Sequence, residues 1–348
     1  MTTQPDTRPA PATADPYLVV DQLQVRFPTH DGEVRAVAGL SYSLPLGRTL
    51  GIVGESGSGK SVSVMALLGL HDARTAKISG SITIGGTEIV GASESTLNQL
   101  RGKDVAMVFQ DAMTALHPFF TIGAQISEAY RLHHHGVGKK RARARAIEML
   151  DLVGIPDPAR RVDDYPHQFS GGMRQRAMIA IALVNNPRLL IADEPTTALD
   201  VTVQAQILDL LIELQTELGS SMIMITHDLG VVAEVADDVL VMYGGYCVEK
   251  GSREQILGGA KMPYTWDLLA TVPDPTSDPS EPLTPIPGSP PSLLHPPPGC
   301  PYHARCRYNS KISERCASTL PDLIPVSGDG HLGRCHLLGT PTPDGGQP

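Results

Sequence analysis

A glycine-rich run in the first quarter of the chain carries residue types that bind phosphate. It follows the pattern G-x-x-x-x-G-K-[ST] and comprises Gly54, Glu55, Ser56, Gly57, Ser58, Gly59, Lys60 and Ser61. Glycines let backbone N–H groups turn inward, and the partial positive charge of a helix start adds to their attraction for an anion. The motif predicts that Lys60 reaches the β- and γ-phosphates of a nucleotide and that the Ser61 hydroxyl ligates Mg²⁺.

Polar residues follow three further apolar runs that are typical of buried strands. They are Gln110, Asp193 with Glu194, and His227. Ligands of open α/β sheets bind outside the carboxyl ends of the strands, so these side chains are expected to converge with the phosphate loop. We expect Asp193 and Gln110 to complete the Mg²⁺ site begun by Ser61. Glu194 would orient or deprotonate an attacking water, and His227 would contact the γ-phosphate and hold Glu194 in line.

A second candidate anion site lies at the start of another predicted helix. Ser170, Gly171 and Gly172 open a stretch with helical spacing that runs to Val184. Serine is a favoured N-cap residue, and the first turn of a helix attracts anions. The spacing alone does not say whose phosphate this segment meets.

Four of the five cysteines lie near the C-terminus, at Cys300, Cys306, Cys316 and Cys335. Disulfides are disfavoured in a reducing cytosol, and structural zinc usually shows close C-x₂₋₄-C pairs, which this segment lacks. A Cys₄ iron–sulfur site tolerates varied loops. An iron–sulfur site, zinc and unmetallated thiols therefore stay open. The fifth cysteine, Cys247, is alone in a predicted hairpin and is interpreted as structural.

Alternating strand and helix patterns predict the elements that must position these groups, and they indicate an α/β fold. Strands are expected at 17–27, 36–44, 49–53, 82–84, 104–109, 189–192, 221–226, 239–243 and 246–249. Helices are expected at 61–68, 122–132, 141–152, 172–184 and 203–218. The phosphate loop thus lies between a buried strand and a helix, which is the context that its motif requires.

Composition limits the class of protein. With 348 residues and 41% hydrophobic content, the chain can bury a sizeable core. Its net charge of −9 disfavours a general nucleic-acid binder. No apolar run approaches the length needed to cross a bilayer. Residues 1–16 are polar, without an export signal, and are interpreted as a disordered tail of a cytosolic chain.

The order of these motifs resembles that of ABC-type ATPase subunits over about residues 17–262. The resemblance is carried by Phe27, the phosphate loop, Gln110, FSGGM at 169–173, LLIADE at 189–194, Ala198-Leu199-Asp200 and His227. It implies a P-loop ABC-type nucleotide-binding domain with a RecA-like core, a β-subdomain and a helical signature subdomain at about 111–180.

In this family two such domains pack head to tail. The resemblance therefore implies that residues 170–172 of one domain close over ATP held by the phosphate loop of the other. It also implies that the adenine stacks on Phe27 and that Asp200 lies at the dimer seam. Met173 replaces the commoner glutamine of the signature, a departure that touches the edge of the site.

Within the family the chain is most similar to ATPases of dipeptide and oligopeptide importers, on residues 110–118, 165–176 and 193–204. The resemblance implies ATP hydrolysis coupled to peptide import at the cytoplasmic face of a membrane. The implied partners are a second, related but non-identical ABC ATPase, two transmembrane permease subunits and, indirectly, an extracytoplasmic peptide-binding protein. Import of nickel or another solute is one alternative. A soluble ABC ATPase acting on DNA or the ribosome is an alternative from another class.

The end of the chain is similar to the C-terminal extension of these importer ATPases. The similarity rests on Pro263-Tyr264-Thr265, Cys300-Pro301-Tyr302, Arg305-Cys306, Cys316, Pro321-Asp322-Leu323 and Cys335-His336. Because residues 273–298 hold 11 prolines, we interpret 263–299 as a Pro-rich linker and 300–348 as a Cys-rich extension. Some members hold a [4Fe–4S] cluster on these cysteines, with Zn²⁺ as the alternative. Met262 stands where that family usually has histidine.

Overall fold

The computed structural model describes residues 15–197, 199–271, 285–309 and 313–338. The tail expected at 1–16 falls almost wholly outside these ranges, as do Ala198 and part of the expected linker. Within the described ranges no helix is long and apolar enough to cross a bilayer.

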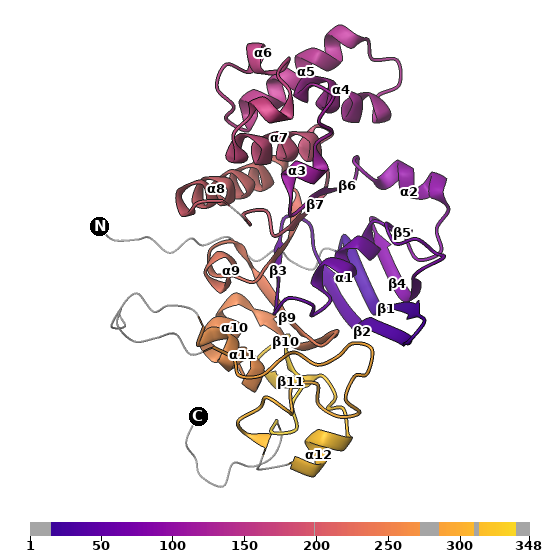
Figure 1. Cartoon of the computed structure of the whole chain (residues 1–348), viewed down its shortest axis with the longest axis vertical. Coiled ribbons are helices and arrows are strands. Elements are labelled where there is room, and N and C mark those ends of the chain that lie inside the picture. Colours follow the sequence, from indigo (N-terminus) through magenta and orange to yellow (C-terminus); the bar gives the residue numbers. More distant parts are fainter. Residues whose placement is uncertain (1–14, 198, 272–284, 310–312, 339–348) are drawn as a thin grey trace, which may run out of the picture.

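The fold is built around a mixed central sheet (Figure 1). In the described residues its strand order is β11-β12-β10-β9-β3-β8-β7-β6. Its parallel strands are β9 (Asp238–Tyr243), β3 (Thr49–Val53), β8 (Ser221–Thr226), β7 (Leu189–Asp193) and β6 (Val105–Val108). The antiparallel strands are β10 (Tyr246–Ser252), β12 (His331–Gly333) and β11 (Ile324–Ser327). Because β3, β8, β7 and β6 run the same way, their carboxyl ends share one edge.

A smaller antiparallel sheet lies beside the central one, in the order β2-β1-β4-β5. Its strands are β1 (Leu18–Thr29), β2 (Gly32–Leu44), β4 (Lys77–Ile84) and β5 (Thr87–Glu88). Gly85 and Gly86 make the β4–β5 turn with φ of 54° and 83°, a left-handed conformation that glycine adopts without strain. This sheet is the β-subdomain, and α1 (Lys60–Leu67) packs against it.

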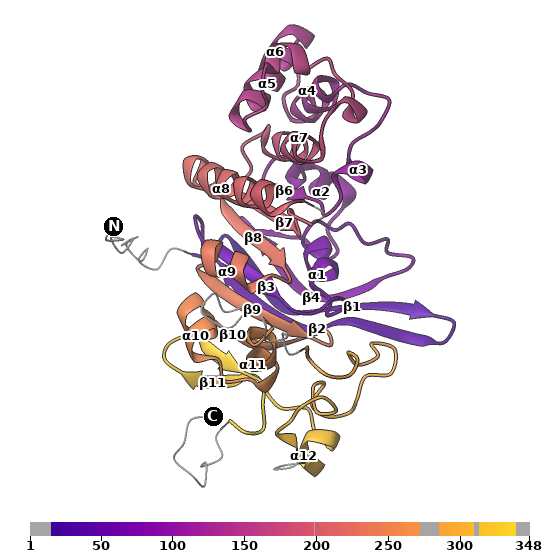
Figure 2. The same ribbon diagram turned by 60° about the vertical axis from the view of Figure 1, so that its left-hand side comes forward.

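Helices gather at one end of the molecule, and the C-terminal extension lies at the other, as both views show (Figures 1 and 2). The helical end contains α3 (Ala112–Ala115), α4 (Ile122–His133), α5 (Lys139–Leu152), α6 (Pro158–Arg161), the short 3₁₀ helix Pro166–Gln168 and α7 (Gly171–Leu183). Next to it lies α8 (Val201–Leu218). The remaining helices are α2 (Glu94–Leu100), α9 (Leu229–Val235), α10 (Arg253–Gly259), α11 (Pro263–Leu269) and α12 (Ser313–Ser318).

In the described part of the chain the buried strands contribute to three hydrophobic cores, and β7 contributes to two of them, one on each face of the sheet. Leu190 and Ala192 of β7 pack into the core formed with α4, α5, α7 and α8. Leu189 and Ile191 point the other way, into the core formed with α1 and the β-subdomain. Successive strand residues face opposite sides, so a strand covered on both faces must be apolar throughout. This explains why the apolar run at 189–192 predicted a strand correctly.

The C-terminal extension continues the central sheet. β12 pairs with β10 at Glu249↔Gly333 and Lys250↔Leu332. Beneath this pairing the His331 Nε2 atom lies 2.9 Å from Glu249 Oε1, and both side chains are fully buried. α11 occupies the first residues of the segment expected to be linker. The extension is therefore fixed to the ATPase core by strand pairing and by a buried polar contact.

Candidate functional site

The phosphate loop joins β3 to α1, and two of its glycines are required by close backbone approach. Gly54 and Gly59 have φ of 148° and 102°. A Cβ on Gly54 would lie 2.1 Å from the Met242 carbonyl oxygen, and one on Gly59 would lie 2.2 Å from that of Ala36. Only glycine fits at either position, so the loop is packed against neighbouring backbone.

Lys60 is enclosed by the loop it belongs to. Its Nζ donates to the carbonyl oxygens of Gly54 at 2.6 Å and Glu55 at 3.0 Å. Burial lowers the pKa of Lys60, and the charges of Glu194, Asp193 and Glu55 oppose this shift. In the described structure the buried Ser58 hydroxyl has no hydrogen-bond partner. A loop that presents the Lys60 ammonium and the unpaired Ser58 hydroxyl can bind a phosphate group.

Ser61 and Asp193 meet at the start of α1 and the end of β7. The Ser61 hydroxyl donates to Asp193 Oδ1 at 3.1 Å. Burial raises the pKa of Asp193, the Ser61 hydrogen bond lowers it, and the charge of Glu194 raises it again. Hydroxyl and carboxylate oxygens are the ligands that Mg²⁺ prefers, so this pair fits the cation. Asp193 is the last residue of β7 rather than the residue after it.

The Glu194 carboxylate contacts three other polar side chains near the strand ends. Its Oε2 accepts from Gln110 Nε2 at 2.9 Å and from Thr197 Oγ1 at 3.0 Å, while Oε1 lies 3.4 Å from His227 Nδ1. Its φ of 46° is left-handed, and its N–H donates to the Ile225 carbonyl at 2.9 Å. Such backbone strain is typical of functional positions, and here it fixes the carboxylate. Sequence reasoning did not identify Thr197.

These groups surround one cavity of about 580 Å³. It is lined by Glu55, Ser56, Gly57, Ser58, Gly59, Lys60, Ser61, Val62, Gln110, Glu194 and His227. The predicted convergence of the strand ends on the phosphate loop is therefore present in the structure. It arises because β3, β8, β7 and β6 are parallel neighbours in that order.

Some predicted site residues do not line this cavity, namely Phe27, Gly54, Ser170, Gly171, Gly172, Asp193 and Asp200. Ser170 is exposed at the start of α7, where its hydroxyl accepts from the Met173 N–H at 3.3 Å. Asp200 caps α8 through the Val203 N–H at 3.0 Å. Phe27 is half-buried at the end of β1 and meets the His71 ring edge to face, with centroids 5.6 Å apart. Ser170 therefore does not contribute to the cavity of its own chain.

Comparison with known proteins identifies the family. A model described as ABC transporter matches residues 37–197, and one described as oligopeptide/dipeptide transporter, C-terminal region, matches residues 248–313. Over 321 residues the chain is 51% identical to the dipeptide transport ATP-binding protein DppD of Bacillus subtilis, a match covering 92% of this chain and 94% of the relative. This chain belongs to the ABC transporter family. The predicted family is thereby confirmed.

Further relatives of this ABC protein differ in length. It is 48% identical over 320 residues to the oligopeptide transport ATP-binding protein OppD of Mycobacterium tuberculosis, covering 92% of this chain. The match spans 52% of that relative, so the chain is about half its length.

Solved ABC proteins share the fold. A dimeric bacterial ABC transporter cassette, MJ0796, bound to ADP and Pi, is 26% identical with a TM-score of 0.61, covering 68% of this chain and 98% of that one. CbiO1 of Clostridium perfringens, part of the transporter complex cbiONQ, is 28% identical to this chain, with a TM-score of 0.59. The match covers 70% of this chain and 92% of CbiO1. The predicted ABC fold is confirmed.

The four C-terminal cysteines of the ABC protein line a common small cavity. Burial, with a smaller contribution from the charges of neighbouring cysteines, raises the pKa of Cys300 to about 12 and that of Cys335 to about 11. Among the described residues, however, no group of three or more His, Cys, Asp or Glu side chains is arranged to hold a metal ion. The structure thus gathers the thiols without forming the predicted metal site.

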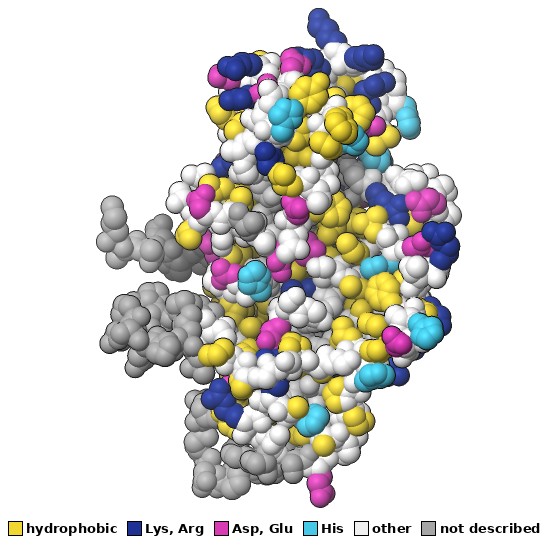
Figure 3. Space-filling model, viewed as in Figure 1, with side chains coloured by type: hydrophobic (Ala, Val, Ile, Leu, Met, Phe, Trp, Pro, Cys, Tyr) yellow, Lys and Arg dark blue, Asp and Glu magenta, His cyan; other side chains and the backbone are white. Residues whose placement is uncertain are grey.

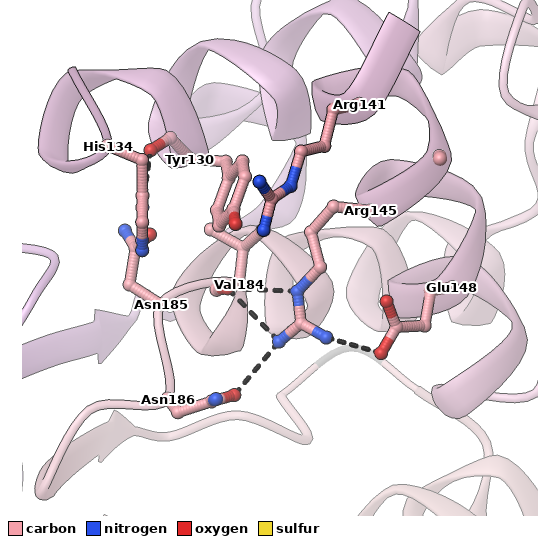
Figure 4. Close-up of a pocket in the computed structure, with 9 residues that line it drawn as sticks. Tyr130, His134, Arg141, Arg145, Glu148, Val184, Asn185 and Asn186 are labelled. Atoms are coloured by element: carbon pink, nitrogen blue, oxygen red, sulfur yellow. Dashed lines mark hydrogen bonds and ion pairs between the residues drawn. The ribbon is translucent and has the colours of Figure 1, made fainter. Parts of the chain in front are cut away.

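A further cavity, of about 350 Å³, lies in the helical subdomain (Figure 4). Arg145 of α5 points into it, donating to the Val184 carbonyl at 3.2 Å and to Asn186 Oδ1 at 2.9 Å. It also pairs with Glu148 at 2.6 Å. These bonds tie α5 to the turn after α7, which gives this cavity a structural explanation.

Proposed function

We propose that this chain is the ATP-hydrolysing subunit of an ABC importer of di- and oligopeptides. The observation that carries the proposal is the cavity at which the phosphate loop and the Glu194 contacts meet. The printed names of the relatives, and the match to the oligopeptide/dipeptide transporter C-terminal region, support peptides as the cargo. ATP with Mg²⁺ is the proposed substrate complex.

Hydrolysis would proceed by positioning and electrostatics, which is most of what phosphoryl transfer to water requires. The oxygen of a water molecule attacks the γ-phosphorus, the bond to the β-bridging oxygen breaks, and ADP leaves with that electron pair. Glu194 orients the water and accepts its proton, while Gln110 and His227 hold the carboxylate. Lys60 stabilises the charge on the phosphates. Mg²⁺, held by Ser61, Asp193 and Gln110, would neutralise phosphate charge.

Closure of a head-to-tail dimer would complete the site. Ser170 and Gly172 are exposed or half-buried on α7 and do not line the cavity of their own chain. Supplied by the neighbouring subunit, they would place a serine hydroxyl and a helix N-terminus against the γ-phosphate. Asp200 would lie at the seam. ATP binding would then drive closure, and hydrolysis would release it.

The membrane partners are proposed from an apolar surface near α3. Phe109, Met113, Phe119 and Phe120 are 39%, 64%, 81% and 54% exposed. Figure 3 shows hydrophobic side chains on the helical end of the molecule, among Lys and Arg side chains. Exposed apolar clusters mark interaction sites, and a coupling helix of a permease subunit fits this one. Two permeases and a second, related ATPase would hold the chain at the cytoplasmic face of the membrane.

Purification of the whole complex under anaerobic conditions tests this proposal. We expect permease subunits and a second ATPase to co-purify, and peptides with their binding protein to stimulate ATP hydrolysis in proteoliposomes. If nickel or another solute stimulated ATP hydrolysis and peptides did not, the chain would be the ATPase of an importer of that solute. Stimulation by DNA or ribosomes, without permease subunits, would contradict the importer.

We also propose that Cys300, Cys306, Cys316 and Cys335 hold a [4Fe–4S] cluster, with Zn²⁺ as the alternative. Their common cavity supports this, because it brings the four cysteine side chains together although they are separated in the sequence. Iron content and visible absorption of the same anaerobic preparation decide between the two metals. A preparation with neither iron nor zinc would leave these residues as thiols.

Phe27 is expected to stack on the adenine. Replacing Phe27 by Ala should raise KM for ATP by about 5- to 150-fold, because one base–ring stack contributes about 1–3 kcal/mol. The kcat should stay within about twofold of the unmodified protein. KM for GTP should rise equally, since every base has a π-face. Phe27→Tyr is the control and should bind both nucleotides normally; an unchanged KM in Phe27→Ala would exclude stacking.

A further inference from the structure

The C-terminal extension contacts the phosphate loop through Arg305. Arg305 pairs with the Glu55 carboxylate through both terminal nitrogens, Nη1 to Oε2 at 2.6 Å and Nη2 to Oε1 at 3.0 Å. The two residues are 250 positions apart in the sequence. The Arg305 side chain is only 5% exposed and that of Glu55 is 26% exposed. A bidentate, largely buried pair of this kind fixes both position and charge.

The rest of the guanidinium is also engaged. Its remaining donors meet the Tyr243 hydroxyl at 3.0 Å, the Pro287 carbonyl at 2.7 Å and the Ile286 carbonyl at 3.2 Å. The five N–H donors of arginine therefore have five acceptors. The guanidinium also lies 5.8 and 5.9 Å from the ring centroids of Tyr243 and Tyr302. Arg305 is thus held by the linker carbonyls of Ile286 and Pro287 and by Tyr243 of β9 while it binds Glu55.

Glu55 is also held from α11. Its backbone N–H donates to the Tyr264 hydroxyl at 2.9 Å. The Tyr264 ring packs against Tyr243 and Tyr302, at centroid distances of 4.4 and 5.2 Å. Backbone and side chain of one loop residue are therefore both fixed by groups C-terminal to the core strands.

We infer that Arg305 is a positioning residue of the ATP site, which neutralises Glu55 and holds its carboxylate for triphosphate binding. Glu55 lines the nucleotide cavity, and its charge acts on Lys60. An uncompensated carboxylate there would repel the phosphates, and in a partly buried site this repulsion is weakly screened. The inference rests on the proposed ATPase function and assigns part of that site to the extension.

The test measures MgATP affinity and ATPase kinetics of the full-length protein in its complex. Arg305→Met should raise Kd and KM for MgATP by about tenfold or more, with kcat changed by less than about threefold, because a buried charge is left unpaired beside the phosphates. The Kd and KM of Arg305→Lys for MgATP should lie between those of Arg305→Met and those of the unmodified protein. The double variant Arg305→Met/Glu55→Gln should recover affinity to within about threefold of the unmodified protein, since the repelling charge is gone.

Arg307→Met is the matched control. Arg307 belongs to the same segment and pairs with the Asp267 carboxylate on α11, yet it is far more exposed and does not contact the phosphate loop. The Arg307→Met variant should bind MgATP with the affinity of the unmodified protein. If Arg305→Met does not fold, Arg305→Lys serves in its place, because lysine keeps the charge but cannot make the bidentate pair with Glu55. An unchanged Kd for MgATP in a folded Arg305→Lys protein would then contradict the role of Arg305.

The outcomes separate this inference from the proposed function. An unmodified complex that neither binds nor hydrolyses ATP removes the proposed function. An active complex in which Arg305→Met binds MgATP normally overturns the role of Arg305. Failure of Glu55→Gln to restore affinity in the double variant overturns the electrostatic argument, because a merely structural loss would not be rescued by removing a second charge.

Discussion

Glu194→Gln is expected to lower ATP turnover by about 10²- to 10⁴-fold, the range that a positioned general base contributes. The amide keeps the shape of the side chain and can still meet Gln110, Thr197 and His227, which contact Glu194 in the structure. It cannot accept the proton of the attacking water. MgATP affinity should therefore persist while hydrolysis is lost, as measured by phosphate release and by equilibrium nucleotide binding.

Glu213→Gln provides the control for this substitution. Glu213 is an exposed residue of α8, outside the nucleotide cavity. Its variant should turn over ATP normally. Normal turnover in Glu194→Gln would remove Glu194 from its assigned role, whereas loss of MgATP affinity would indicate that it supports binding.

Ser170→Arg is expected to lower the ATPase rate of the assembled complex by about 10²- to 10³-fold, the effect of losing a group that stabilises transition-state charge. The larger side chain would also block closure over the neighbour's nucleotide. MgATP affinity of the isolated chain should stay within about twofold, because Ser170 does not line the cavity of its own subunit. This separation between binding and turnover is specific to a site completed by the partner.

Ser93→Arg is the matched control for Ser170→Arg. Ser93 is likewise an exposed N-cap, accepting from the Thr96 N–H at 3.2 Å, so both variants lose a helix cap costing about 1 kcal/mol. Only Ser170→Arg should impair hydrolysis. Weakened MgATP binding in the isolated Ser170→Arg chain would indicate a site within one subunit and contradict the head-to-tail dimer.

Much of the core was predictable because its signals are local. The strands at 49–53 and 221–226 have the predicted bounds, since an unbroken apolar run between turns leaves few alternatives. The helices starting at Ile122 and Gly171 begin within one residue of the predicted position. The short helices α2, α9 and α10, and the strands β11 and β12, were not predicted. They are short and depend on packing against the core.

The sequence by itself determined the chemistry of the phosphate loop and of the polar residues at the strand ends. Both are recognised from consecutive residues, because the glycine spacing and the apolar runs of buried strands are local patterns. Only the tertiary structure decided that Thr197 joins Gln110 on Glu194, and that β12 extends the central sheet. It alone paired Arg305 with Glu55. Contacts between distant segments leave no periodic pattern in either segment, so they emerge only when the chain is folded.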